Sequence, residues 1–197
     1  MRFVIALILL VLAGCDKESE PKGQAQPAST GQAGASDNAE ITLESANGMR
    51  AMLSYKFAGQ KAPSAPFADA QGQDVSLADF EGKPLLLNIW ATWCAPCKAE
   101  MPTLDALAKL EKGRMSVIAV SQDLEGRAPV AAFFTETGVK NLVPYTDADN
   151  ALLTAFNNAI ALPTTILYDS DGKEVWRVAG GVEWDEAEMA KLLRAAD

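Results

Sequence analysis

The sequence predicts an α/β domain in which a central mixed β-sheet is flanked by helices. Apolar runs of strand length alternate with helical apolar spacing from residue 85 onward. Near the C-terminus, two strand-like runs flank the turn Asp169–Gly172, which predicts an antiparallel hairpin. Strands that alternate with helices favour parallel pairing, and the final hairpin adds antiparallel strands. About 130 residues are enough for one such domain.

The first half of this domain contains two predicted buried strands. A short hairpin is expected within 67–77, because apolar pairs flank the turn at Gln71-Gly72. The almost wholly apolar run 85–90 predicts the first buried strand, and 115–121 predicts the second. Between them, Leu104, Leu107 and Leu110 have helical spacing, so a helix is expected from about 94 to 112.

The second half is expected to alternate in the same way. Its predicted elements are a helix at 129–137, a helix at 148–158, a strand hairpin at 164–168 and 174–178, and a closing helix at 185–196. Pro129 suits the first turn of its helix, and Gly138 suits the end of that helix. Asp185 is the expected N-cap of the closing helix.

The first 14 residues form a candidate signal peptide. One basic residue, Arg2, precedes an apolar run that is shorter than the ~20 residues a membrane-spanning helix needs. The run ends in Leu12-Ala13-Gly14-Cys15, which resembles a bacterial lipobox and implies that Cys15 is lipidated. The alternative is an ordinary signal peptide followed by an incidental cysteine. Asp16 resembles the signal that retains lipoproteins in the inner membrane, which implies an address on its periplasmic face.

A tether is expected to join the lipidated cysteine to the domain. Residues 16–38 are rich in Gly, Pro, Ser, Gln and Ala and lack large apolar side chains, so this stretch cannot offset the entropy of ordering. Residues 40–57 are ambiguous, because their apolar side chains fit either a helix or strands. The expected division is a signal peptide at 1–14, the lipidated Cys15 and tether at 15–62, and the folded domain at 63–197.

Composition excludes several kinds of function. The formal net charge of −9 argues against nucleic acid as a partner. The chain has no histidine, which removes the commonest general base and metal ligand. It has three cysteines, and lipidation of Cys15 would leave Cys94 and Cys97 as a pair. No structural disulfide is then available, so a disulfide between these two would be the reactive one.

Cys94 and Cys97 lie one helical turn apart at the start of the helix that follows the first buried strand. Unpaired N–H groups and the helix dipole at such a position favour the thiolate over the thiol. They lower the cysteine pKa from ~8.5 to roughly 3.5–7.5. The C-x-x-C spacing alone leaves two interpretations open, a redox site and a metal site. Copper(I) would suit two soft thiolates, although no histidine is present to assist.

The residues around the two cysteines carry a family resemblance. Trp90-Ala91-Thr92-Trp93-Cys94-Ala95-Pro96-Cys97-Lys98 resembles the active-site motif of thioredoxin-fold proteins of the TlpA/ResA type. Leu162-Pro163-Thr164-Thr165 resembles the cis-proline loop that faces the dithiol in this fold. The resemblance covers roughly 63–196 and implies a thioredoxin-like fold with an N-terminal hairpin extension. It also implies a thiol–disulfide oxidoreductase that needs no cofactor beyond its own Cys94–Cys97 disulfide.

The resemblance implies a role for each residue of the site. Cys94 would attack a substrate disulfide, and Cys97 would resolve the mixed disulfide. Pro163 would keep a backbone N–H away from the thiols, and the Leu162 backbone would pair with an extended substrate. Trp93 and Pro96 would shape the surface that the substrate approaches, whereas Trp90 is expected in the core.

Proton transfer is expected to differ from that of cytosolic thioredoxins. Those proteins carry a buried Asp six residues before the first cysteine, where this chain has Asn88, which cannot titrate. Glu100, three residues after Cys97, resembles the acidic residue that TlpA/ResA-type proteins place near the dithiol. Such a carboxylate could accept the Cys97 proton. Spacing alone favours a solvated surface charge at Glu100, so this assignment depends on the resemblance.

The resemblance further implies a reductant of oxidised periplasmic proteins, such as apocytochrome c or a copper-site assembly protein. A membrane thiol transporter of the DsbD/CcdA kind would supply its electrons. The alternatives are a disulfide-donating oxidant of the DsbA kind and a copper(I)-binding assembly factor that uses the same cysteines. An oxidant is less expected, because no insertion resembling the helical domain of such proteins lies between Asp123 and Pro144.

Overall fold

The computed structural model describes residues 40–45, 48–157 and 160–196. The strands are β1 (Glu40–Glu44), β2 (Arg50–Ser54), β3 (Phe67–Ala68), β4 (Asp74–Val75), β5 (Leu85–Trp90), β6 (Ser116–Ser121), β7 (Pro144–Thr146), β8 (Thr164–Tyr168) and β9 (Glu174–Ala179). The helices are η1 (Leu77–Phe80), α1 (Ala95–Leu110), α2 (Arg127–Thr137), α3 (Ala151–Ala155), α4 (Ala187–Leu193) and η2 (Arg194–Ala196). Within this part of the chain, no helix combines the length and apolarity needed to cross a bilayer. The expected signal peptide, Cys15 and the tether as far as residue 39 lie outside the described residues.

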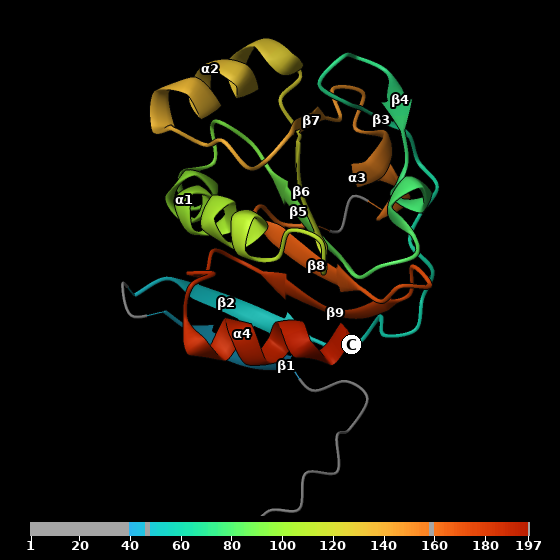
Figure 1. The fold of residues 1–197 in the computed structure, drawn as a ribbon, viewed down its shortest axis with the longest axis vertical. Helices are drawn as coiled ribbons and strands as arrows, with labels where there is room; N and C mark the ends of the chain where they lie inside the picture. The colour runs from blue at the N-terminus through green and yellow to red at the C-terminus, as the bar shows by residue number, and fades with distance from the viewer. Residues whose placement is uncertain (1–39, 46–47, 158–159, 197) are drawn as a thin grey trace, which may run out of the picture. The chain divides into compact units, whose positions relative to one another are not determined.

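All the described strands belong to one mixed sheet, in the order β1-β2-β9-β8-β5-β6-β7-β3-β4 (Figure 1). β5 pairs in parallel with β6, and β6 pairs in parallel with β7. The remaining neighbours are antiparallel, including β8 with both β5 and β9. The expected mixed sheet with a closing hairpin is therefore confirmed, and so is the short hairpin of β3 and β4.

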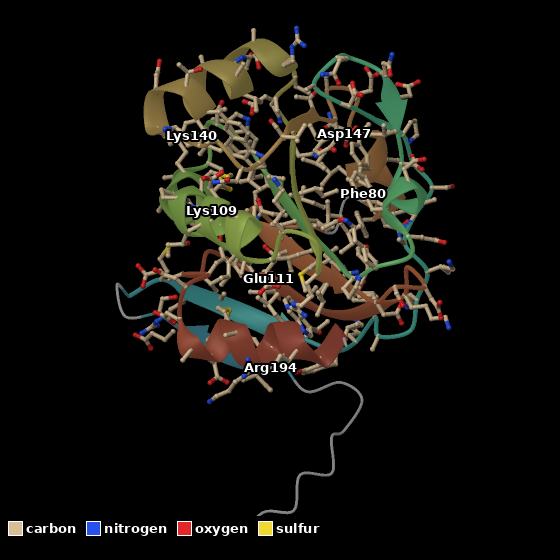
Figure 2. All side chains as sticks on the ribbon, in the orientation of Figure 1. Phe80, Lys109, Glu111, Lys140, Asp147 and Arg194 are labelled. Carbon is tan, nitrogen blue, oxygen red and sulfur yellow. A yellow bond between two sulfur atoms is a disulfide. The ribbon has the colours of Figure 1, made fainter. Side chains whose placement is uncertain are left out.

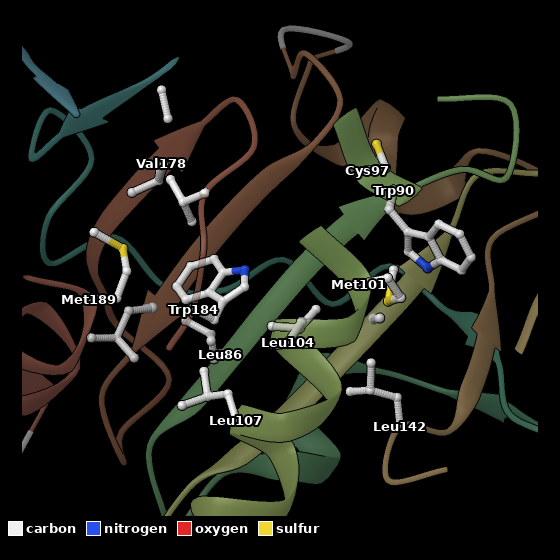
Figure 3. Close-up of a cluster of buried hydrophobic side chains, with 14 of the residues drawn as sticks. Leu86, Trp90, Cys97, Met101, Leu104, Leu107, Leu142, Val178, Trp184 and Met189 are labelled. Atoms are coloured by element: carbon white, nitrogen blue, oxygen red, sulfur yellow. The ribbon is translucent and has the colours of Figure 1, made fainter. Parts of the chain in front are cut away.

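Both faces of the central strand β5 are covered. Alternate side chains of a strand point to opposite faces, so β5 contributes to two cores. Leu86 and Trp90 of β5 belong to a core that includes α1, α2 and α4, and Figure 3 shows this packing. Leu87 and Ile89 belong to a second core that includes α3 and η1. Trp90 is fully buried, and its ring stacks on that of Phe134 in α2 with centroids 5.8 Å apart. The expectation of a core position for Trp90 is thus confirmed.

The expected tether is wrong for its described part, which belongs to the fold. β1 and β2 form a hairpin, and β2 continues the sheet by pairing with β9. Ala51 and Leu53 alternate along β2 and are buried in the larger core. The chain then runs beside β9, where Gly59 N–H donates to the Glu174 carbonyl at 2.7 Å. The folded domain therefore includes the described residues from Glu40 onward, because β2 pairs with β9 and closes an edge that would otherwise stay open.

The starts of α3 and α4 differ from their expected positions. α3 starts at Ala151 rather than residue 148, because the Asp147 carboxylate accepts hydrogen bonds from the first N–H groups of the helix, at 2.8–3.3 Å. Figure 2 shows Asp147 at this junction. α4 starts at Ala187 and its N-cap is Glu186, so the expected cap at Asp185 is wrong. Gly138 does end α2, in the left-handed conformation with φ 75°.

Asp105 fastens α1 to the loop that follows α2. Its Oδ1 accepts backbone N–H groups from Lys140 (3.1 Å), Asn141 (2.7 Å) and Leu142 (3.1 Å). Its Oδ2 accepts the Asn141 side-chain amide at 2.7 Å. Figure 2 shows Lys140 between α1 and α2. Since α1 carries Cys97, this cluster helps to fix the position of the second thiol.

We expect Asp105→Ala to destabilise the oxidised protein by about 3 kcal/mol, because three backbone N–H groups lose their acceptor in a mostly buried place. Asp105→Asn keeps one acceptor oxygen and should lose about half as much. Urea unfolding with the disulfide intact measures both values. A change below ~0.5 kcal/mol for Asp105→Ala would show that water replaces the carboxylate.

Candidate active site

The two cysteines lie where β5 meets α1, and they form a disulfide. Cys94 is the N-cap of α1 and has an extended backbone, with Pro96 in the first turn. Cys94 is 7% exposed, whereas Cys97 is completely buried. Of the two sulfur atoms, that of Cys94 is therefore the one an incoming thiol can reach.

The helix start is arranged to stabilise a thiolate on Cys94. The Cys97 backbone N–H donates to Cys94 Sγ at 3.3 Å. This N–H is one of the groups that a helix N-terminus leaves without a backbone partner, and the helix dipole adds to its effect. Once the disulfide opens, the same N–H can stabilise negative charge on Cys94.

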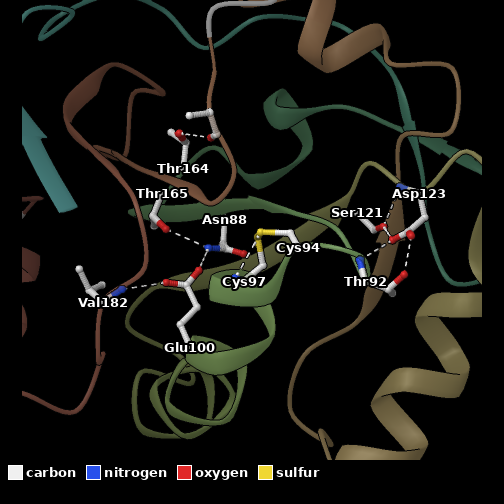
Figure 4. Close-up of a disulfide and its surroundings, with 11 residues drawn as sticks. Asn88, Thr92, Cys94, Cys97, Glu100, Ser121, Asp123, Thr164, Thr165 and Val182 are labelled. Carbon is white, nitrogen blue, oxygen red and sulfur yellow. Dashed lines mark hydrogen bonds between the residues drawn. A yellow bond between two sulfur atoms is a disulfide. The ribbon is translucent and has the colours of Figure 1, made fainter. Parts of the chain in front are cut away.

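A hydrogen-bonded carboxylate holds the loop that precedes Cys94. Asp123 lies two residues after β6 and is buried, and it accepts the Thr92 backbone N–H at 2.9 Å and the Thr92 hydroxyl at 2.5 Å. The Ser121 hydroxyl also donates to Asp123, at 2.5 Å (Figure 4). This network fixes the backbone two residues before Cys94. The sequence offered no local pattern that marked Asp123 for this task.

The peptide bond between Leu162 and Pro163 is cis, as the sequence motif predicts. Leu162 lines a groove of about 720 Å³ together with Cys94. The other residues of this groove come from four separate segments: Trp93, Pro96, Gln122, Leu124, Asn150, Leu153 and Ile160. Trp93 and Leu124 are both 67% exposed. The groove thus joins an accessible sulfur to a largely apolar surface.

Glu100 is buried, so the surface charge that its spacing favours is wrong. Its side chain is 0% exposed and lies one helical turn after Cys97. Asn88 Nδ2 donates to Glu100 Oε1 at 2.7 Å, and the Val182 backbone N–H donates to Oε2 at 3.1 Å. Burial raises the pKa of Glu100 to about 8, against the opposing effects of Val182, Asn88 and the Trp184 indole. At neutral pH the oxidised site therefore holds a proton.

Asn88 lies between this carboxyl group and the disulfide. Its Nδ2 donates to Glu100 and also to Thr165 Oγ1, at 2.9 Å. Its Oδ1 is buried and has no hydrogen-bond partner in the described part of the chain. Figure 4 shows the Asn88 amide between Glu100 and the cysteine pair, with the oxygen directed toward the sulfur atoms. A thiol on Cys97 could donate to this oxygen.

The structure gathers the residues that the sequence singled out, with one exception. Trp93, Pro96 and Leu162 line the groove beside Cys94, and Glu100 lies beneath the cysteine pair. Cys15 lies outside the described residues. Sequence reasoning missed Asp123, Val182 and the groove residues Asn150, Leu153 and Ile160. These act through position in the fold and carry no motif of their own.

Comparisons with known proteins agree with this geometry. The Redoxin family model matches residues 57–193. The thiol-disulfide oxidoreductase ResA of Bacillus thuringiensis subsp. konkukian is 34% identical over 123 residues, which are 62% of this chain and 69% of that protein. A candidate thiol:disulfide interchange protein DsbE from Chlorobium tepidum has a solved structure with a TM-score of 0.62 and 25% identity, covering 71% of this chain and 98% of that one.

A third similar structure is the exposed lipoprotein thioredoxin Etrx1 of Streptococcus pneumoniae, with a TM-score of 0.53 and 25% identity. It covers 66% of this chain and 96% of that one. The region that the Redoxin family model matches, residues 57–193, contains the cysteine pair, Glu100 and the cis-proline loop. The chain therefore belongs to the Redoxin family and, within it, to the thiol–disulfide oxidoreductases.

Proposed function

We propose that this protein reduces disulfides in oxidised periplasmic proteins while a lipid on Cys15 holds it at the inner membrane. The observation that carries the proposal is the buried Glu100 beneath the cysteine pair. It gives the site a group that can take the proton of the second thiol and keep it after the disulfide has formed.

The first step is attack on the substrate. The Cys94 thiolate, held by the Cys97 N–H, attacks one sulfur of the substrate disulfide. A bond forms between Cys94 and that sulfur, and the other substrate sulfur leaves as a thiolate. Cys97 is still a thiol at this stage, and Asn88 Oδ1 is placed to accept its S–H.

The second step releases the substrate. Glu100, as a carboxylate, takes the proton from Cys97, and the new thiolate attacks Cys94 Sγ. The Cys94–Cys97 disulfide forms, and the second substrate sulfur leaves as a thiolate. Two electrons have passed to the substrate, and one proton remains on Glu100. Because burial raises the pKa of Glu100 to about 8 in the oxidised protein, Glu100 keeps this proton at neutral pH once the disulfide has formed.

Recharging reverses the proton movement. A donor thiolate attacks Cys94, the more accessible sulfur, and Cys97 leaves as a thiolate that regains the proton from Glu100. A second donor thiolate then attacks the donor sulfur of this mixed disulfide. The donor disulfide forms, and Cys94 leaves as a thiolate. We assign the donor role to a membrane thiol transporter of the DsbD/CcdA kind, which the lipid anchor would bring within reach.

The buried carboxyl group also favours a reductant over an oxidant. A strong oxidant such as DsbA derives its oxidising power from a stabilised reduced form. In this site, a carboxylate formed at Glu100 would place a second negative charge near the Cys94 thiolate, in a buried environment that excludes water. That arrangement disfavours the thiolate form. The reduced state therefore gains less stability here than it would without Glu100.

The groove indicates how a substrate would lie. Pro163 has no N–H, and the Leu162 carbonyl and N–H can pair with an extended substrate backbone. The exposed side chains of Trp93 and Leu124 would contact apolar residues beside the substrate disulfide. Oxidised apocytochrome c and copper-site assembly proteins are the substrate classes that we propose.

The lipid anchor is supported by the lipobox-like Leu12-Ala13-Gly14-Cys15 and by likeness to the exposed lipoprotein thioredoxin of Streptococcus pneumoniae. Asp16 favours retention at the inner membrane. The described domain itself presents no membrane-spanning helix.

We expect the stability of the oxidised protein to fall as pH rises from about 5 to 8. Between the unfolded pKa of 4.5 and the folded value of about 8, the folded protein binds one more proton than the unfolded chain. The free energy of unfolding should therefore decrease by about 1.4 kcal/mol per pH unit from this group. Glu100→Gln should abolish this slope, and Glu125→Gln, which removes an exposed carboxylate, should retain it. Urea unfolding at pH 5, 6, 7 and 8 measures it, and equal slopes in wild type and Glu100→Gln would contradict the raised pKa.

Cys97→Ala should trap substrates in cells, because the mixed disulfide on Cys94 then has no resolving thiol. Adducts that disappear under reducing conditions are expected for this variant, and Cys94→Ala, the matched control, should give none. Non-reducing electrophoresis of anionic-detergent extracts measures the difference. Absence of adducts, together with failure of the wild-type chain to reduce insulin disulfides, would remove the proposed function.

Cys15→Ser should prevent lipidation and processing at that residue. We expect wild-type protein to begin at an acylated Cys15 and to partition into the detergent phase. The variant should lack the acyl mass and show altered electrophoretic mobility. Mass spectrometry of the N-terminal peptide decides the matter, and identical N-termini and partitioning in both proteins would exclude the anchor.

A further inference from the structure

The five residues Gly180–Trp184, which follow β9, contact the cis-proline loop, Pro96 and Glu100 of the candidate active site. Their contacts are Gly180 N–H to the Pro163 carbonyl (2.8 Å), Gly181 against Pro96, Val182 N–H to Glu100 Oε2 (3.1 Å) and Trp184 N–H to Thr103 Oγ1 (3.2 Å). We call these residues the post-β9 segment. Val182 and Trp184 are almost completely buried, so the segment also keeps water from Glu100.

The β1–β2 hairpin supports this segment from the other side. The Glu183 N–H donates to Ser45 Oγ at 3.3 Å, and Ser45 itself is buried at the end of β1. At Gly181, an added Cβ would lie 3.2 Å from Met49 Sδ and 3.4 Å from the Pro96 carbonyl oxygen. Met49 therefore meets the same backbone position as the active-site proline.

Gly180 shows how closely the hairpin and the segment approach. A Cβ at this residue would lie 2.5 Å from the Arg50 carbonyl oxygen and 3.0 Å from the Ala51 Cα. Its φ of +108° also lies in a region that L side chains rarely adopt. Glycine is thus required where β2 passes the segment, and the hairpin lies in direct backbone contact with it.

The hairpin lies before residue 57, where the Redoxin family match begins, whereas the post-β9 segment lies within the match. The core of the matched region already contains Cys97, Asn88 and Glu100. The hairpin residues that contact the post-β9 segment, and through Val182 affect Glu100, lie outside that region. This difference suggests a task for the hairpin beyond closing the sheet edge.

We propose that the β1–β2 hairpin is a positioning element of the redox site, in which Ser45 and Met49 hold the post-β9 segment against Glu100. The effect on turnover rests on the proposed function, because the hairpin can affect turnover only if Glu100 serves as the proton acceptor. The positioning of Glu100 does not depend on it. The hairpin residues touch neither sulfur and act through Val182.

The direction of the effect follows from what surrounds Glu100. Burial is the largest cause of its raised pKa, and it outweighs the Val182, Asn88 and Trp184 contacts that lower the pKa. None of these neighbours is charged, and Cys97 does not titrate while it is in the disulfide. If the segment is loosened, water reaches the carboxyl group and replaces the Val182 N–H as a donor. The pKa of Glu100 then falls toward that of an exposed carboxyl group.

The test measures the side-chain carboxyl resonance of Glu100 by ¹³C NMR in the oxidised full chain in detergent, titrated from pH 4 to 10. Glu100→Gln identifies the resonance by its loss. Ser45→Ala removes the acceptor for Glu183, and Met49→Ala removes the side chain at Gly181. Met52→Ala is the matched control, because Met52 belongs to the same hairpin but is 38% exposed and contacts Thr42 instead.

We expect the Glu100 inflection to fall by about one pH unit in Ser45→Ala and Met49→Ala, and to stay at the wild-type pH in Met52→Ala. An unchanged or raised inflection in both test variants, with the disulfide and circular dichroism of the wild type, would overturn the inference. The rate at which the mixed disulfide resolves, followed over the same pH range, is a separate readout. A shifted resonance without a shifted rate profile would count against Glu100 as proton acceptor and not against the hairpin.

Discussion

The burial of one carboxyl group, Glu100, is the constraint on which the rest of the site depends. An ionisable group removed from water must be neutral or well hydrogen-bonded, since an unpaired buried charge is very costly. Asn88 from β5 and Val182 from the post-β9 segment supply those bonds, and burial keeps the group protonated near neutral pH. Strand register, helix placement and loop path must all be correct for this to occur.

The sheet order explains how distant segments meet at this carboxyl group. β9 pairs with β8 on one side and with β2 on the other. The residues that leave β9 must therefore pass between the cis-proline loop before β8 and the hairpin of β1 and β2. Gly180 allows this passage, because it bonds to Pro163 and lies against Arg50. One short stretch of backbone thus contacts Pro96 between the two cysteines, the proline loop and the hairpin.

Much of the architecture could be predicted because its signals are local. Apolar runs of strand length marked β5, β6, β8 and β9, and the motif around Cys94 placed the thiols at a helix start. The same reasoning failed for 40–54, where a few apolar residues fit a helix or a strand equally well. Pairing with β9 decides that case, and no local pattern records it. The cap of α4 at Glu186 instead of Asp185 is a smaller failure of the same kind.

The sequence by itself determined the chemistry that is available: two thiols at one turn's spacing, a proline before a strand, no histidine, and a carboxyl group three residues after Cys97. Local spacing controls these features, so they can be read from the chain directly. Only the tertiary structure decided that Glu100 is buried and protonated. Its partners lie 12 and 82 residues away, and burial depends on which segments the sheet brings together. The fold therefore decides how reactive the two cysteines are, whereas the sequence alone shows which two cysteines form the pair.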